Sequence, residues 1–185
     1  KIAVDMVKEK LISKKEAVLR IDPNSLDTLL HPTLDEKSSI NVIANGLPAS
    51  PGAASGKVVF TSEEAERLTG MMQDTILVRV ETSPEDIQGM HAAKGILTAR
   101  GGMTSHAAVV ARGMGRPCVS GSSEIDINYE NKSFKTSSIE IKEGEVITID
   151  GSTGRIISGS VATVKPEISG DFSKLMSWAD SFRKL

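Results

Sequence analysis

The chain has 185 residues, with 22 Lys and Arg against 24 Asp and Glu and a formal net charge of −2. This balance gives no electrostatic case for nucleic acid, because binding a phosphate backbone needs a surplus of basic residues. No apolar run approaches the ~20 residues of a membrane span. We therefore expect neither nucleic acid nor a membrane among its partners. The single cysteine, Cys118, excludes an internal disulfide and a cysteine-clustered zinc site.

The chain begins with Lys1 instead of Met, and no signal or transit segment is visible. We expect it to be a piece of a longer protein. The default expectation for its location is the cytoplasm. A chloroplast or a glycosome remains open, because targeting ends would lie outside the piece.

Residues 1–30 have the spacing of short amphipathic helices. Ser13 is predicted to cap the second of them, with Glu16 as its capping-box partner, and Pro23 to open a third turn. These helices have more apolar surface than they can bury together, so they are expected to pack on something outside the chain. Residues 31–45 show no clear period and are predicted to be a linker.

Residues 46–158 are predicted to be one α/β domain, because apolar strands alternate there with capped helices. The polar stretch 128–137 is expected to be a surface insertion. Residues 159–185 are predicted to form a second linker and an amphipathic helix that leads to a further domain. Strands are predicted at 57–60, 75–80, 95–98, 118–119, 138–141, 146–149 and 155–157, and helices at 63–68, from 83 and at 105–114.

The most informative stretch follows the strand at 95–98. Gly101 and Gly102 form a turn, Thr104 and Ser105 stand at the expected helix N-cap, and His106 lies in the first helical turn. The run of small apolar residues at 107–111 predicts a helix that is buried on most sides.

A helix N-terminus has unpaired amides and a partial positive charge, so it stabilises phosphate and disfavours imidazolium. A neutral His106 at this position is a candidate phosphoryl acceptor, since histidine can form covalent intermediates. Gly101 and Gly102 would let the backbone approach the phosphate, and Thr104 and Ser105 would add hydroxyl donors. Arg112 is a further candidate for phosphate contact or for support of the site.

Other interpretations remain open at this stage. His106 could be a capping or core histidine, or the turn could bind a nucleotide phosphate without chemistry. A lipoyl- or biotinyl-like carrier would need a lysine at a hairpin tip, and Lys94 is the nearest candidate. No cluster of carboxylates has the spacing of a metal site, so no metal ligand is predicted in the chain.

The stretch Gly101–Arg112 resembles the sequence around the active histidine of the PEP-utilising enzymes. Met103 favours the dikinase branch of that family over the synthase, where Arg is usual and which is the alternative. The segments KIAVDMV, GLPASPGAASGKVVF and GDFSKLMSWAD extend the resemblance almost end to end.

The resemblance implies a swivelling β/β/α phosphohistidine domain with helical flanking segments. His106 would take a pyrophosphoryl group from ATP, give the outer phosphoryl to phosphate, and pass the remaining one to pyruvate, reversibly. The products are AMP, pyrophosphate and phosphoenolpyruvate. The partners would be the nucleotide-binding and pyruvate-binding domains of a homodimer, with Mg²⁺ ligands outside this chain. In plant relatives the residue that matches Thr104 is a regulatory phosphorylation site; a plain N-cap or donor role is the alternative.

Overall fold

The computed structural model describes residues 2–22, 26, 30–35, 40–164 and 170–183. The chain divides into two compact units. One takes its residues from 1–30 and 165–185, and the other spans His31–Val164. Among the described residues, no helix combines the length and apolar character needed to cross a membrane.

In the described residues of the smaller unit, the helices are α1 (Ile2–Lys8), α2 (Lys14–Leu19) and α7 (Gly170–Phe182). The Ser13 hydroxyl accepts a hydrogen bond of 3.2 Å from the Glu16 amide, which confirms the predicted cap of α2. Lys14 Nζ lies 5.7 Å from the centre of the Trp178 ring, a cation–π contact that joins α2 to α7. The turn predicted to open at Pro23 lies outside the described residues.

An eight-stranded sheet forms the centre of the larger unit, in the order β2-β12-β11-β4-β5-β6-β7-β3. Its strands β4 to β7 are parallel to one another, and the others pair antiparallel. The strands are β2 (Val42–Asn45), β3 (Leu47–Ser50), β4 (Ala53–Val59), β5 (Thr75–Arg79), β6 (Gly95–Thr98), β7 (Cys118–Ser120), β11 (Val146–Asp150) and β12 (Arg155–Ser158).

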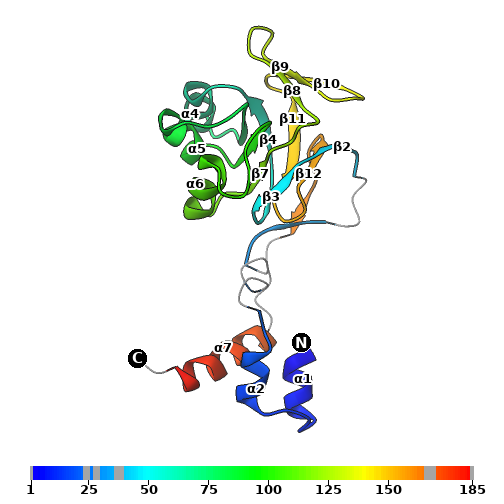
Figure 1. Ribbon diagram of the computed structural model, residues 1–185, viewed down its shortest axis with the longest axis vertical. Coiled ribbons are helices and arrows are strands. Elements are labelled where there is room, and N and C mark those ends of the chain that lie inside the picture. The colour runs from blue at the N-terminus through cyan, green and yellow to red at the C-terminus, as the bar shows by residue number, and fades with distance from the viewer. Residues whose placement is uncertain (1, 23–25, 27–29, 36–39, 165–169, 184–185) are drawn as a thin grey trace. The chain divides into compact units, whose positions relative to one another are not determined.

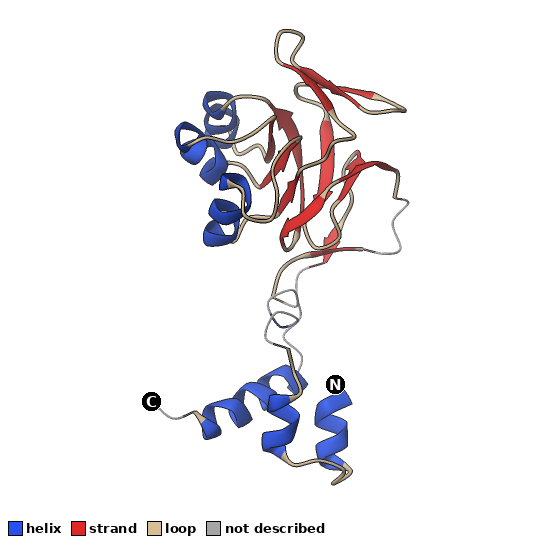
Figure 2. Ribbon diagram, viewed as in Figure 1, coloured by secondary structure: helices blue, strands red, loops and turns tan. Residues whose placement is uncertain are grey.

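Helices cross between the parallel strands and cover one face of this sheet, as Figures 1 and 2 show. Because β4 to β7 are parallel, their carboxyl ends lie at the same edge of the sheet. These connections contain α4 (Ser62–Gly70), the 3₁₀ helix η1 (Pro84–Asp86), α5 (Ile87–Ala92) and α6 (His106–Met114).

A second, three-stranded sheet adds buried residues to the apolar cluster on the face away from the helices. It consists of β8 (Asp126–Asn128), β9 (Ser133–Lys135) and β10 (Glu140–Lys142). Phe134 of β9 is fully buried and packs in the same apolar cluster as Ile147 of the main sheet. The expectation of a surface insertion at 128–137 therefore holds for most of the stretch, which is exposed, but not for Ser133 and Phe134, which are buried in β9. One large apolar side chain anchors this otherwise polar stretch to the core.

Side chains of the main sheet alternate between the two faces, as the period of a strand requires. In β5, Leu77 belongs to the apolar cluster under the helices, whereas Ile76 and Val78 belong to the apolar cluster on the opposite face of the sheet. Both faces are covered, which explains why the central strands read as continuous apolar runs. The layers confirm the predicted mixed α/β fold in its β/β/α form.

Residues 31–45 differ from the linker predicted there. Strand β1 (Thr33–Leu34) pairs antiparallel with β13 (Thr163–Val164), and β2 joins the main sheet next to β12. Ile43 and Ala44 of β2 are buried. Four residues are too few to show a period in the sequence, so the strand becomes evident only from its partner.

Candidate functional site

The candidate site lies where β6 ends and α6 begins. We call residues 100–105, between Thr98 and the helix, the histidine turn. Ser105 is the N-cap of α6, and its hydroxyl accepts a hydrogen bond of 3.3 Å from the Ala108 amide. The predicted helix start is confirmed, and His106 is the first residue of the helix. The amides of this first turn have no intrahelical partners and point out of the helix end.

The two glycines of the histidine turn have different structural reasons. Gly101 has a φ of +108°, and a Cβ there would lie 2.9 Å from the Ser105 Cβ. Side chains are therefore excluded at Gly101 both by the backbone conformation and by space. Gly102 has nothing within 4 Å of such a Cβ, so it leaves room beside the turn. Its carbonyl accepts a hydrogen bond of 3.0 Å from the Ser105 amide.

Buried hydroxyls attach the histidine turn to the sheet. Ser120 Oγ of β7 lies 3.2 Å from Thr98 Oγ1 and 3.3 Å from Ser105 Oγ. Thr98 and Ser120 are fully buried, and the Thr98 hydroxyl donates to the Arg100 carbonyl at 2.8 Å. Thr98 and Ser120 were not predicted as site residues. They lie on β6 and β7, which are separated in the sequence and become neighbours only in the folded sheet.

Arg112 supports the same turn from the helix. Its Nε donates to the Ala49 carbonyl at 2.7 Å, and its Nη2 donates to the Met103 carbonyl. The guanidinium thus ties α6 to β3 and to the histidine turn. Thr104, which precedes the N-cap, is exposed. Its side chain is therefore accessible, and Ser105, not Thr104, is the N-cap of α6.

Burial of α6 is less complete than predicted. Ala107, Ala108 and Ala111 are buried under the helix, but the side chain of Val109 is 55% exposed. The three alanines lie on one helical face, and their small side chains let the helix approach the sheet closely. The expectation of burial on most sides is wrong for Val109, which points away from that face.

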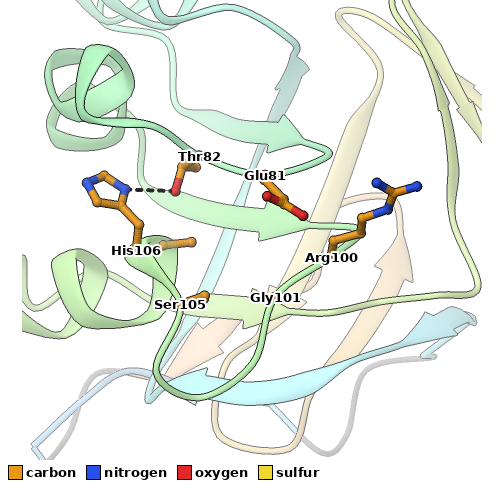
Figure 3. A pocket seen from close by; sticks show the side chains of 7 residues that line it. Glu81, Thr82, Arg100, Gly101, Ser105 and His106 are labelled. Atoms are coloured by element: carbon orange, nitrogen blue, oxygen red, sulfur yellow. Dashed lines mark hydrogen bonds between the residues drawn. The ribbon is translucent and has the colours of Figure 1, made fainter.

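A second segment completes the site. We call residues 80–83, between β5 and η1, the threonine loop. Thr82 Oγ1 lies 3.1 Å from His106 Nδ1, and the two groups form a hydrogen bond. Figure 3 shows that the other ring nitrogen, Nε2, lies on the side of the imidazole away from Thr82. His106 is half-buried, so one nitrogen is oriented by the protein and the other remains accessible.

The ring and the two segments line an open cavity of about 240 Å³. Glu81 and Arg100 contribute charged side chains to its lining, and in Figure 3 both lie beyond Thr82 as seen from His106. Glu81, Thr82 and Arg100 were not predicted as site residues. One signal was available, because adjacent parallel strands bring their carboxyl ends to one edge. The residues after β5 must therefore lie near those after β6.

A buried carboxylate holds the far end of the threonine loop. Asp86 is 5% exposed, and its Oδ2 accepts a hydrogen bond of 2.9 Å from the Ser83 amide. Its Oδ1 accepts from the Ser62 hydroxyl at 3.1 Å and lies 3.4 Å from Arg79 Nε. An ion pair with several hydrogen bonds fixes the residue next to Thr82.

Other candidates lie apart from this site. Lys94, the candidate for a carrier lysine, lies between α5 and β6 with its Nζ 3.6 Å from Asp74 Oδ1, not at a hairpin tip. Cys118 is buried beneath α6, and burial raises the pKa of its thiol from 9.0 to about 12. Within the described part of the chain, no three His, Cys, Asp or Glu side chains group closely enough to hold a metal ion.

The sequence of this chain is similar to the sequences of known proteins. Residues 71–154 match the family described as "PEP-utilising enzyme, mobile domain". That range includes the threonine loop, the histidine turn and α6. The part of the chain that holds the candidate site is therefore similar to the mobile domain of the PEP-utilising enzymes.

Individual relatives extend the similarity over the whole chain. It is 60% identical over 185 residues to "Pyruvate, phosphate dikinase" of Rhizobium meliloti, a match that covers 100% of this chain and 21% of that protein. The dikinase of Clostridium symbiosum is 56% identical over 186 residues, again 100% and 21%. "Pyruvate, phosphate dikinase 1, chloroplastic" of Arabidopsis thaliana is 54% identical over 187 residues, 100% of this chain and 19% of that protein. The chain thus spans about a fifth of the length of these relatives.

Two solved structures were also matched. "N-terminal domain of Enzyme 1 - Nitrogen" is 24% identical with a TM-score of 0.31, covering 56% of this chain and 37% of that one. An NMR structure of Enzyme I is 22% identical with a TM-score of 0.35, covering 60% and 40%. At these scores they carry no argument.

Proposed function

We propose that the chain is the phosphocarrier domain of an enzyme of the pyruvate, phosphate dikinase type, with His106 as the carrier. The observation that carries the proposal is the orientation of the imidazole. Thr82 holds Nδ1 at 3.1 Å, and Nε2 stays accessible at the start of a helix. The similarity to dikinases over all 185 residues supports the reaction class.

In the first step Nε2 of the neutral imidazole attacks the β-phosphorus of ATP. An N–P bond forms as the bond from that phosphorus to the AMP oxygen breaks. The proton stays on Nδ1 and is donated to Thr82 Oγ1. Phosphorylation places positive charge on the ring, so this hydrogen bond becomes charge-assisted and stronger. Amides of the first turn of α6 stabilise the transferred phosphates.

Inorganic phosphate then attacks the outer phosphorus, and the bond from that phosphorus to the bridging oxygen breaks. Pyrophosphate leaves, and one phosphoryl group stays on Nε2. The remaining phosphoryl group moves from Nε2 to the enolate oxygen of pyruvate, which gives phosphoenolpyruvate and restores the neutral ring. In this scheme the reactions with ATP and phosphate take place at one domain and the reaction with pyruvate at another. The mobile domain swivels between these two domains. The proposed role of Gly101 and Gly102 is to let the backbone approach the phosphate, with Ser105 capping the helix that binds it. For Arg112 we propose support of the turn.

The remaining elements of the proposal concern the whole enzyme. Mg²⁺ would neutralise phosphate charge when bound, with ligands in other domains. We further propose that residues 1–30 end the nucleotide-binding region and that the chain from 159 leads to the pyruvate-binding barrel. The enzyme would be a homodimer located in the cytoplasm or, as for the Arabidopsis relative, in a chloroplast.

A graft tests the carrier role. The chain replaces the corresponding segment of the Rhizobium meliloti dikinase, to which it is 60% identical, and the graft receives labelled phosphoenolpyruvate. The graft should take up an acid-labile, alkali-stable label, and its His106→Asn version should take up none. Equal labelling of both versions would refute the proposal. Intact mass separates this proposal from a lipoyl or biotinyl carrier, which would carry an adduct on lysine.

A further inference from the structure

Tyr129, the only tyrosine of the chain, connects the small sheet to the candidate site. It lies between β8 and β9, and its hydroxyl accepts a hydrogen bond of 2.8 Å from the Val80 amide. Val80 is the first residue of the threonine loop. The contact joins segments 49 residues apart in the sequence.

The tyrosine ring is itself fixed by two neighbours. Arg79 Cζ lies 5.3 Å from the ring centre in a cation–π contact, and Phe60 meets the ring edge-on with the centroids 6.4 Å apart. The Arg79 guanidinium also donates from Nη1 to the Phe60 carbonyl at 3.0 Å. These contacts leave the hydroxyl little freedom to follow Val80 if the loop moves.

The peptide groups of Val80 link this contact to the histidine turn. The Val80 amide donates to Tyr129, and the Val80 carbonyl accepts a hydrogen bond of 2.9 Å from the Arg100 amide. Arg100 directly precedes Gly101, and Thr82 is two residues after Val80. One residue is thus bonded to the small sheet on one side and to the histidine turn on the other.

We infer that Tyr129 is a positioning residue for phosphoryl transfer, because its hydroxyl fixes the threonine loop and thereby holds Thr82 against Nδ1 of His106. The inference rests on the proposed function. It gives the three-stranded sheet a second purpose besides covering the core. At the other end of the loop Asp86 holds Ser83, so Thr82 lies between two anchors.

Tyr129→Phe isolates the hydroxyl, because it keeps the ring that contacts Arg79 and Phe60. Losing one hydrogen bond of ordinary strength should increase exchange of the Val80 amide by about tenfold. Thr136→Val is the matched control. Among the described residues, the Thr136 hydroxyl forms hydrogen bonds with Ser138 and Ile139, in the turn between β9 and β10. Thr82→Val serves as the reference for complete loss of the Nδ1 contact.

The test measures ¹⁵N shifts of the His106 ring, Val80 amide exchange and the labelling rate in the graft. We expect Tyr129→Phe to move the ring shifts toward those of Thr82→Val and to slow labelling by about threefold to tenfold. Thr136→Val should change none of these three quantities. Suppose that the wild-type graft takes up label. If Tyr129→Phe then leaves the ring shifts and the labelling rate unchanged, the inference is wrong. A wild-type graft without label would instead refute the proposed function.

Discussion

The histidine turn and the threonine loop reach the same imidazole, but they are held in different ways. The turn is held mainly by bonds within residues 98–112, such as Gly102 with Ser105 and Arg112 with Met103, and by Ser120 of β7. The loop is held by Tyr129 and Asp86, which lie outside it in the sequence. The nucleophile is thus encoded locally, whereas its orientation depends on the tertiary structure. Variants in the two regions should therefore fail differently.

The largest effect on stability is expected in the anchor of the threonine loop. Asp86→Ala leaves Arg79 without its carboxylate and Ser62 and Ser83 without their acceptor. Removing one member of a buried ion pair should lower the free energy of unfolding by about 3 kcal/mol. Denaturant unfolding measures the loss. The matched control Asp126→Ala removes an exposed carboxylate of β8 and should change stability by under about 0.5 kcal/mol. Equal unfolding midpoints for the two variants would contradict this account of the loop.

Within the histidine turn, the two glycines make a matched pair. Gly101→Ala combines a φ of +108° with a Cβ 2.9 Å from that of Ser105, so it should cost about 2 kcal/mol of stability. Gly102→Ala meets nothing within 4 Å and should be close to neutral. Thermal unfolding of both variants checks this, and a larger loss for Gly102→Ala would show that the turn is described wrongly.

The contact between the two regions should affect rate more than stability. Thr82→Val keeps the shape of the side chain but removes the hydroxyl that holds Nδ1. Labelling of His106 in the graft should slow by about tenfold, which corresponds to roughly 1.4 kcal/mol in the barrier. Thr82→Ser restores the hydroxyl and should recover most of the rate. If the valine variant labels at the wild-type rate, Thr82 does not orient the ring.

Without any substitution, the reactivity of the Cys118 thiol reports on the helix that carries His106. Cys118 lies under α6, and burial raises the pKa of its thiol from 9.0 to about 12. Between these values the unfolded chain has lost this proton and the folded chain retains it, so the contribution to stability is lost as pH rises from 9 toward 12. Iodoacetamide at pH 8.5 should alkylate Cys118 slowly in the folded chain and rapidly in denaturant. Rapid alkylation of the folded chain would mean that α6 opens from the sheet.

Much of the fold could be predicted because the central strands are strongly apolar and their helices carry local caps. Strand 95–98 and the cap at Ser105 were predicted from such signals and are confirmed. The predicted strand 138–141 overlaps β10, but β2, β8 and β9 were missed. These three strands are short, and only Ile43, Ala44 and Phe134 are buried apolar residues in them.

The same difference applies to the candidate site. His106, Gly101 and Ser105 follow from one continuous stretch whose residue types suit a phosphate at a helix start. Thr82 carries no motif, and its importance comes from the pairing of β5 with β6. Sequence reasoning that combined strand order with strand ends would have found the loop, but not the hydrogen bond of Thr82 to Nδ1.

The central claim is that Thr82 reserves Nδ1 and leaves Nε2 to accept the phosphoryl group. Heteronuclear ¹H–¹⁵N–³¹P NMR of the labelled graft measures directly which ring nitrogen is bonded to phosphorus. We predict coupling of ³¹P to Nε2 of His106 and a proton retained on Nδ1. Phosphorus on Nδ1, or on any other residue, would contradict the account.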